Sequence, residues 1–183
     1  MRVIAGSARR LLLVTPDGLD TRPTQDKIKE TLFNILQMQV PGSIFLDICA
    51  GSGGIGIEAL SRGAAGAVFV DQSPISVDHI NRNLKNTGLT DAAKVIRGDY
   101  AAVLLGMEQR FDFAFLDPPY ASGLLPKALL AVQRVMKEHG LIICEHPKEQ
   151  SLPEEVGEFA LKKIYRYGKV CVSTYHRKGV DDE

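Results

Sequence analysis

Short apolar runs alternate with amphipathic stretches along most of this 183-residue chain. Five of the runs are short and rich in β-branched and aromatic side chains, and they predict buried strands. The stretches between them carry apolar residues at helical spacing and predict helices. Such an alternation is typical of an α/β protein whose sheet is mainly parallel. The predicted strands are residues 43–49, 67–71, 93–99, 111–117 and 140–146.

Capping residues and helix breakers place the ends of two predicted helices. Thr24 can cap a helix that begins at about that residue, Asp26 suits its first turn, and Pro41 ends it. Ser73 followed by Pro74 predicts the start of a second helix, because serine is a common cap and proline a common first residue.

The two ends of the chain differ from its middle. Residues 1–18 predict two short strands that form a hairpin outside the main sheet. Residues 159–177 predict two strands joined near Gly168, an antiparallel hairpin on one edge of the sheet. We therefore expect an N-terminal hairpin over residues 1–20 and one α/β domain over residues 21–183.

The net charge of the chain is not that of a simple nucleic-acid-binding protein. The chain has 22 basic and 22 acidic residues and so lacks the overall positive charge of that class. The basic residues are unevenly spread, since residues 1–16 and 160–178 contain several arginines and lysines and no acid. The usual explanation for such runs is a solvated face.

Cysteine usage and hydropathy predict a cytoplasmic protein without a metal site. Cys49, Cys144 and Cys171 are far apart, and each lies in an apolar run, which predicts buried free thiols in a reducing compartment. The N-terminus offers only a short apolar run at residues 11–14, too short for a signal peptide or a membrane span.

Carboxylates stand at or near the ends of four predicted strands, at Asp47, Asp71, Asp99 and Asp117. Ligands of open α/β sheets bind beyond the carboxyl ends of the strands. An unpaired carboxylate beside buried strands is unfavourable, and a single one is often only a helix cap. Four of them at one edge indicate a binding site.

The first aspartate leads into a glycine-rich loop. Gly51, Gly53 and Gly56 fit the G-x-G-x-x-G pattern, in which glycines let the backbone approach a ligand closely. Asp47, just before them, would repel a pyrophosphate but attract an ammonium or sulfonium group. S-adenosylmethionine carries both groups, so the loop, including Ala50, is predicted to bind this cofactor.

Two further aspartates suit the adenosine part of such a cofactor. Asp71 can accept hydrogen bonds from both ribose hydroxyls, each worth about 1.5–3 kcal/mol to a charged acceptor. Asp99 would accept from the adenine amine while capping the next helix, and Tyr100 would lie against the ring. The ribose contact fits a nicotinamide cofactor equally well.

A double proline ends the fourth predicted strand. Pro118 and Pro119 cannot continue a sheet, because each lacks an N–H and has a fixed φ. We expect Asp117, ionised at its ordinary pKa of about 3.9, and the Pro118 carbonyl to accept the two N–H groups of an exocyclic base amine. The lone pair of the amine nitrogen would then face a methyl donor. Tyr120 would stack on the extruded base, for about 1–3 kcal/mol.

These motifs, in this order and spacing, resemble class I S-adenosylmethionine-dependent amino-methyltransferases with a DPPY motif. The resemblance narrows to the bacterial 16S ribosomal RNA (guanine-N2)-methyltransferases on the stretches 22–36, 47–64 and 165–175, and it covers nearly the whole chain. The family has more usually a phenylalanine where Cys49 stands, which we interpret as a packing substitution.

The resemblance implies a Rossmann-like fold with a seven-stranded sheet whose last strand is antiparallel. It implies that Arg22, Pro23 and Thr24 fold over the cleft, with Thr24 at the cofactor and Arg22 on a phosphate or the cofactor carboxylate. It makes the N-terminal hairpin, with Arg9 and Arg10, the RNA-docking element. The implied protein is a monomeric enzyme that acts on 16S ribosomal RNA or the small ribosomal subunit and needs no metal or membrane.

Alternatives remain open at this point. The motif at residues 117–120 serves the N6 amine of adenine in DNA or RNA equally well, although the chain leaves no room for a separate DNA-reading domain. A nicotinamide-dependent oxidoreductase would use the glycine loop and Asp71 but leaves Asp47 unexplained. A non-catalytic RNA-binding module would need none of these acids. The choice of guanine N2 rests on the resemblance alone.

Overall fold

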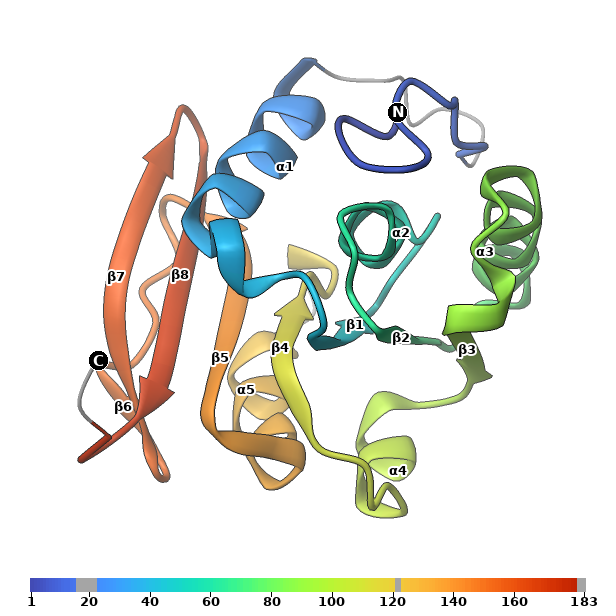
Figure 1. Cartoon of the computed structure of the whole chain (residues 1–183). Coiled ribbons are helices and arrows are strands. Elements are labelled where there is room, and N and C mark those ends of the chain that lie inside the picture. Colours follow the sequence, from blue (N-terminus) through green and yellow to red (C-terminus); the bar gives the residue numbers. More distant parts are fainter. Residues whose placement is uncertain (16–22, 121–122, 181–183) are drawn as a thin grey trace.

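One sheet runs through the chain with helices on both of its faces (Figure 1). The computed structural model describes residues 1–15, 23–120 and 123–180, and of residues 23–25 it describes the backbone. The strands are β1 (Ile44–Ile48), β2 (Gly66–Asp71), β3 (Ala93–Arg97), β4 (Phe111–Leu116), β5 (Met136–Pro147), β6 (Glu155–Val156), β7 (Phe159–Tyr167) and β8 (Val170–Arg177). The α-helices are α1 (Pro23–Leu36), α2 (Gly54–Ser61), α3 (Pro74–Thr87), α4 (Tyr100–Leu105) and α5 (Leu125–Val132).

The strand order is β3-β2-β1-β4-β5-β8-β7-β6, and the first five strands of the chain pair in parallel. Strand β8 pairs with β5 in the antiparallel sense, and β7 and β8 form the predicted antiparallel hairpin. The prediction of a mainly parallel sheet with an antiparallel last strand is confirmed. Within the described residues the sheet has eight strands rather than the seven expected, because the two-residue strand β6 pairs with β7.

Each face of the sheet has its own apolar cluster. Helices α1, α2 and α3 cover one face, and α4 and α5 cover the other (Figure 1). In β1, Phe45 belongs to the first cluster, whereas Leu46 and Ile48 belong to the second. Because both faces are covered, the parallel strands are nearly continuous apolar runs, which is the signal that predicted them.

Two helix starts test the predicted caps. The Ser73 hydroxyl accepts a hydrogen bond from the backbone N–H of Ser76 at 3.3 Å, and Pro74 opens α3, as predicted. Helix α1 begins at Pro23, so the prediction that Thr24 caps it is wrong. A proline suits the first helical position because the N–H that it lacks has no partner within the helix there.

Residues 1–15 form a hairpin that lies over α2 (Figure 1), but the prediction of two short strands is wrong, because no residue of this segment belongs to a strand. An isolated antiparallel bridge between Arg2 and Leu12 closes it. Its buried apolar side chains join the cluster under α1, α2 and α3. The division between a hairpin at residues 1–20 and a domain at residues 21–183 stays a prediction.

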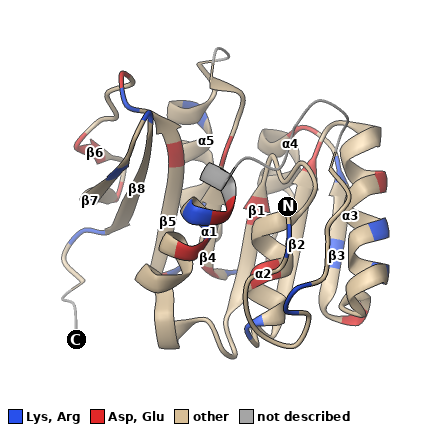
Figure 2. Cartoon of the chain, turned by 90° about the horizontal axis from the view of Figure 1, so that it is seen from above, with Lys and Arg blue, Asp and Glu red and all other residues tan. Residues whose placement is uncertain are grey.

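Charged residues are spread over many elements. Figure 2 shows basic segments on α3, on β3 and on the β7–β8 hairpin.

Cys144 and Cys171 are buried free thiols, as predicted, whereas Cys49 is partly exposed. None of the helices in the described part of the chain has the length and apolar character needed to cross a bilayer.

Candidate active site

A cavity of about 170 Å³ opens where β1, β4 and β5 end, beside the first turn of α2. The glycine loop, α1 and the first residue of the N-terminal hairpin complete its wall. Three carboxylates line it: Asp47, Asp117 and Glu145. The predicted clustering of Asp47 and Asp117 at one edge of the sheet is therefore observed, and Glu145 is an addition.

Strand register explains why these three acids face the same cavity. Asp47 of β1 lies opposite Phe115 of β4, and Phe115 lies opposite Ile143 of β5. Side chains two positions apart in a strand point to the same face. Asp117, two residues after Phe115, and Glu145, two residues after Ile143, are therefore neighbours on that face. Sequence analysis missed Glu145 because it lies inside the fifth predicted strand rather than at its last position.

Asp47 is buried, and this burial has the largest effect on its pKa. Its Oδ2 accepts a hydrogen bond from the backbone N–H of Gly56 at 2.9 Å. Burial raises the pKa of Asp47 to about 8, although the Gly56 N–H opposes this rise and the Asp71 carboxylate adds to it. Within the described residues Oδ1 has no hydrogen-bond donor. A cationic ligand would therefore be stabilised beside this side chain.

Asp117 shares its surroundings with Glu145 and Tyr120. Burial raises the pKa of Asp117 well above its ordinary value, and the charges of Glu145 and Asp47 raise it further. Burial also raises the pKa of Glu145, which the hydrogen bond from the Tyr120 hydroxyl opposes. This hydroxyl donates to Glu145 Oε1 at 2.9 Å. The expectation that Asp117 has an ordinary pKa is wrong for the ligand-free site, because a nearby carboxylate and burial favour its neutral form.

The double proline separates a buried from an exposed part of the turn after β4. Pro118 is buried, whereas Pro119 and Tyr120 are exposed. The side chain of Tyr120 keeps 45% of its area accessible although its hydroxyl is hydrogen-bonded. The ring is thus fixed at its tip and accessible on its face.

The glycine loop is held by Asp71 at the end of β2. Asp71 Oδ2 accepts from the Gly51 N–H at 2.9 Å, and its Oδ1 accepts from the Ser73 N–H at 2.9 Å. Each carboxylate oxygen has a second acceptor position, so these bonds are compatible with the predicted ribose contacts. Gly53 has φ +77°. A Cβ at Gly56 would lie 2.3 Å from a ring carbon of Phe69, so this glycine allows α2 to pack on β2.

A second, smaller hollow of about 40 Å³ lies beside the loop. Asp71, Asp99 and Tyr100 all line it, as expected of an adenosine site. Asp99 also caps α4 as predicted, since its Oδ2 accepts from the Ala102 N–H at 3.1 Å. Cys49 lines both hollows, which places them next to each other.

Cys49 links the two hollows in a conformation that is rare for its residue type. Its φ is +58°, in the left-handed region that few non-glycine residues adopt. Burial raises its pKa to about 12, and the surrounding carboxylates, with Asp71 first, add to the rise. The side chain is therefore a neutral thiol at physiological pH, in keeping with the view that it has no catalytic role.

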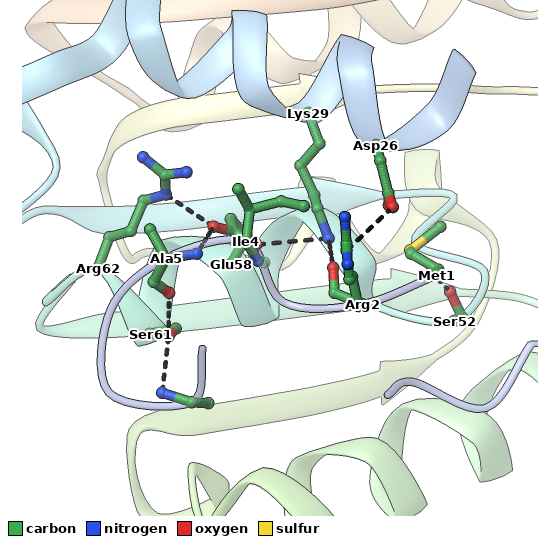
Figure 3. Close-up of polar contacts among 12 residues, drawn as sticks. Met1, Arg2, Ile4, Ala5, Asp26, Lys29, Ser52, Glu58, Ser61 and Arg62 are labelled. Carbon is green, nitrogen blue, oxygen red and sulfur yellow. Dashed lines mark hydrogen bonds and ion pairs between the residues drawn. The ribbon is translucent and has the colours of Figure 1, made fainter. Parts of the chain in front are cut away.

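A buried ion network attaches the N-terminal hairpin to α2 (Figure 3). Glu58 of α2 is fully buried and accepts from the backbone N–H groups of Ile4 at 2.8 Å and Ala5 at 3.0 Å. Arg62 Nε lies 2.8 Å from Glu58 Oε1, and Lys29 Nζ lies 3.3 Å from Oε2. One buried carboxylate thus joins the hairpin, α1 and α2.

Lys29 connects this network to the cavity. Its buried ammonium group donates to the Arg2 carbonyl, and its side chain lines the cavity together with Met1 (Figure 3). Burial lowers the pKa of Lys29, whereas Glu58 opposes this change. Sequence analysis did not single out Lys29 or Glu58, because each is a lone charge on an otherwise apolar helix face.

The predicted RNA contacts are not tested by this geometry. Arg9 and Arg10 are exposed on the N-terminal hairpin. Arg22 and the side chain of Thr24 lie outside the described residues. In the described part of the chain, no group of three or more His, Cys, Asp or Glu side chains is arranged to hold a metal ion.

Comparison with known proteins identifies the family. The family described as "Conserved hypothetical protein 95" matches residues 1–176. The chain belongs to this family. It is 41% identical to the "Putative rRNA methyltransferase YlbH" of Bacillus subtilis, over 98% of this chain and 100% of that protein. It is 33% identical to "Ribosomal RNA small subunit methyltransferase D" of Escherichia coli, over 97% of this chain and 90% of that protein.

Solved structures agree with this assignment. The putative methyltransferase yhhF from Escherichia coli has a TM-score of 0.86 at 32% identity and covers 98% of this chain and 99% of its own. A putative methylase from Haemophilus influenzae has a TM-score of 0.80 at 31% identity, with 97% and 98% covered. The Rossmann-like methyltransferase fold and the resemblance drawn from the motifs are both confirmed.

Proposed function

We propose that this protein transfers the methyl group of S-adenosylmethionine to the N2 amine of a guanine in small-subunit ribosomal RNA. The observation that carries the proposal is a single cavity lined by Asp47 and Asp117. Asp47 belongs to β1, which leads into the glycine loop, and Asp117 begins the DPPY turn on the same face of the sheet. Its relatives named as ribosomal RNA methyltransferases support the substrate class.

The residues present fit this cofactor. Asp47 offers a buried carboxyl oxygen without a donor in the described part of the chain, which suits the ammonium group. Asp71, Asp99 and Tyr100 line the adjoining hollow, which suits the ribose and the adenine. When bound, the cofactor supplies a methyl group that is already activated by the positive charge on sulfur.

The chain's own contribution is to position the amine. Asp117 accepts one N–H of the target amine and the Pro118 carbonyl accepts the other, so that the nitrogen becomes tetrahedral as its lone pair forms the new bond. The surplus proton passes to Asp117 or to water. In its ionised form Asp117 is a stronger proton acceptor than an ordinary carboxylate, because its pKa is raised.

Tyr120 provides a surface for the extruded base. Its hydroxyl is anchored on Glu145, and its ring remains accessible. A fixed aromatic face favours base stacking without prior loss of side-chain freedom. Access to a base that has left the helix is a general requirement for chemistry on its amine.

The decisive experiment is a methyl-transfer assay with labelled S-adenosylmethionine. The substrates are small ribosomal subunits from cells that lack this enzyme, naked 16S RNA and DNA, and the products are digested to nucleosides and identified by mass. N2-methylguanosine from either RNA substrate is the expected result. N6-methyladenine would keep the roles of Asp117 and Tyr120 but overturn the target amine, and no transfer to any nucleic acid would overturn the proposed function.

A further inference from the structure

Glu145 is the one cavity carboxylate to which the proposed reaction assigns no task. It lies beside Asp117, because Leu116, the last residue of β4, lies opposite Cys144 of β5, and Asp117 and Glu145 each come next in the chain. At this position β5 is paired with β8, since Glu145 lies opposite Val172, and one residue earlier Cys144 is paired with β4. The backbone that carries Glu145 is therefore held by strand pairing.

Its carboxyl group is oriented rather than free. The Tyr120 hydroxyl donates to Oε1 at 2.9 Å, and within the described residues Oε2 has no hydrogen-bond donor. The same side chain lines the cavity that contains Asp117. One oxygen is thus fixed by protein, and the other is available beside the group that is proposed to bind the reacting amine.

We propose that Glu145 accepts the N1–H of the target guanine and so selects guanine over other purines that carry an amine at the same place. This inference rests on the proposed function, and it names the residue that sets base specificity at that site. Tyr120 then has two tasks, since it stacks on the base and orients Glu145.

The chemistry of purine edges supports this assignment. Guanine presents two adjacent donors on its Watson–Crick edge, the N1–H and the N2 amine, so two neighbouring acceptors match it. The N1 of adenine or 2-aminopurine is an acceptor, and its lone pair would face a carboxylate. A buried acceptor that loses its donor is strongly disfavoured, which makes such a site selective against the analogue.

The electrostatics of the cavity agree with a ligand that brings donors. Burial raises the pKa values of both Asp117 and Glu145, and the hydrogen bond from Tyr120 only opposes this rise at Glu145, so further donors would stabilise both carboxylates. A guanine edge supplies hydrogen-bond donors to both side chains at once. Adenine supplies donors only from its amine.

The test compares two substrates that share the reacting amine. After the modified nucleotide has been mapped, RNA is assembled by ligation with either guanosine or 2-aminopurine riboside at that position. Wild-type protein should methylate guanosine with a kcat/KM at least tenfold higher. Glu145→Gln retains an acceptor for Tyr120, and its amide can rotate to donate to the bare N1, so the ratio of the two kcat/KM values should fall by about 10- to 100-fold.

A matched control is Glu138→Gln, which makes the same change at an exposed position near the other end of β5. It should leave the ratio unchanged. Affinities of the two RNAs in the presence of S-adenosylhomocysteine give a second readout that needs no turnover. The inference fails if Glu145→Gln lowers kcat/KM by the same factor for both substrates, or if wild-type protein has equal kcat/KM values for them. Absence of transfer from wild-type protein to guanosine would instead overturn the proposed function.

Discussion

At the scale of single residues, the acids of the site differ in what they do. Asp117 is proposed to touch the reacting amine, whereas Asp71 holds the glycine loop through Gly51 and the start of α3 through Ser73. Asp47 combines both kinds of task, since one oxygen accepts from Gly56 and the other is available to a ligand. Substitutions at these positions should therefore have different effects on turnover and on cofactor binding.

Replacement of Asp117 by asparagine should remove turnover and spare the cofactor. The amide cannot take up a proton, and it weakens the hydrogen bond that strengthens as the amine becomes tetrahedral, so we expect kcat to fall at least about 100-fold. The affinity for S-adenosylhomocysteine, measured by calorimetry, should stay within a few-fold. Asp78→Asn, on the exposed face of α3, is the matched control. A variant that retains most of its activity would contradict the proposed role.

The raised pKa of Asp47 predicts pH-dependent cofactor binding. The unfolded side chain titrates at about 3.9, whereas in the fold its pKa is about 8. Between these values the folded ligand-free protein holds the extra proton, so its stability should fall as pH rises and level off above the folded pKa. A cationic cofactor favours the ionised form, so its affinity should rise between pH 6 and 8, by up to about tenfold per unit.

Titration calorimetry of the cofactor in buffers of different ionisation enthalpy measures this proton release directly. Asp47→Asn has no proton to release and should flatten both the stability and the affinity profiles. Equal proton release by wild type and variant would show that another group is responsible.

Sequence analysis located four aspartates that line the two hollows, because aspartates at strand ends are a local signal. Glu145 gave no such signal, since only the register between β4 and β5 brings it beside Asp117. The pKa of Asp117 was equally inaccessible, because it depends on burial and on charges that come from other strands.

At the scale of elements, the N-terminal hairpin is joined to the sheet domain through one buried charge. Glu58 compensates Lys29 and Arg62 and accepts two backbone N–H groups of the hairpin. Gly6 allows the close approach, since a Cβ there would lie 1.7 Å from the Ser61 carbonyl oxygen. The position of the hairpin is therefore coupled to the wall of the cavity that Lys29 lines.

Glu58→Gln should destabilise the protein strongly. The change leaves the buried ammonium of Lys29 without a counter-charge, and breaking a buried ion pair in this way costs about 3–5 kcal/mol. Chemical denaturation of wild type, Glu58→Gln and the exposed control Glu30→Gln measures the loss. A difference below about 1 kcal/mol would show that the network contributes little net stability.

Element boundaries were less predictable than element types. Strand β5 begins at Met136, four residues before the predicted start, because Met136 pairs with Phe111 ahead of an irregularity in the register. Strand β6 has two residues and is defined by its pairing with β7, which no short sequence pattern reveals.

At the scale of the whole molecule, the fold separates the acids of the cavity from the exposed arginines of the N-terminal hairpin. The acids gather at the strand ends, whereas Arg9 and Arg10 lie exposed on the hairpin above α2. The mainly parallel sheet and its antiparallel edge were predictable, since alternating strands and helices and the C-terminal hairpin leave few topologies. The attachment of the N-terminal hairpin was not, because it depends on contacts between segments far apart in the chain.

Arg9→Ala combined with Arg10→Ala should weaken RNA binding without changing cofactor affinity. If both side chains contact phosphates, the slope of log affinity against log salt should become shallower by about 1.5. Filter binding of 16S RNA over a salt series measures it. Arg82→Ala combined with Lys85→Ala removes two exposed charges from α3 and is the matched control. An unchanged slope in the hairpin variant would remove this segment from the docking surface.

The burial of Cys49 has a consequence for the reactivity of its thiol toward the cofactor. S-adenosylmethionine is an alkylating agent, and a thiolate is the side chain that such agents attack most readily. Cys49 stands between the two hollows, yet burial and the neighbouring carboxylates keep its pKa at about 12. Burial, with a further contribution from the carboxylates that would attract a cationic methyl donor, thus keeps the sulfur protonated. A protonated thiol is a poor nucleophile, so the same surroundings that suit the cofactor disfavour its attack by Cys49.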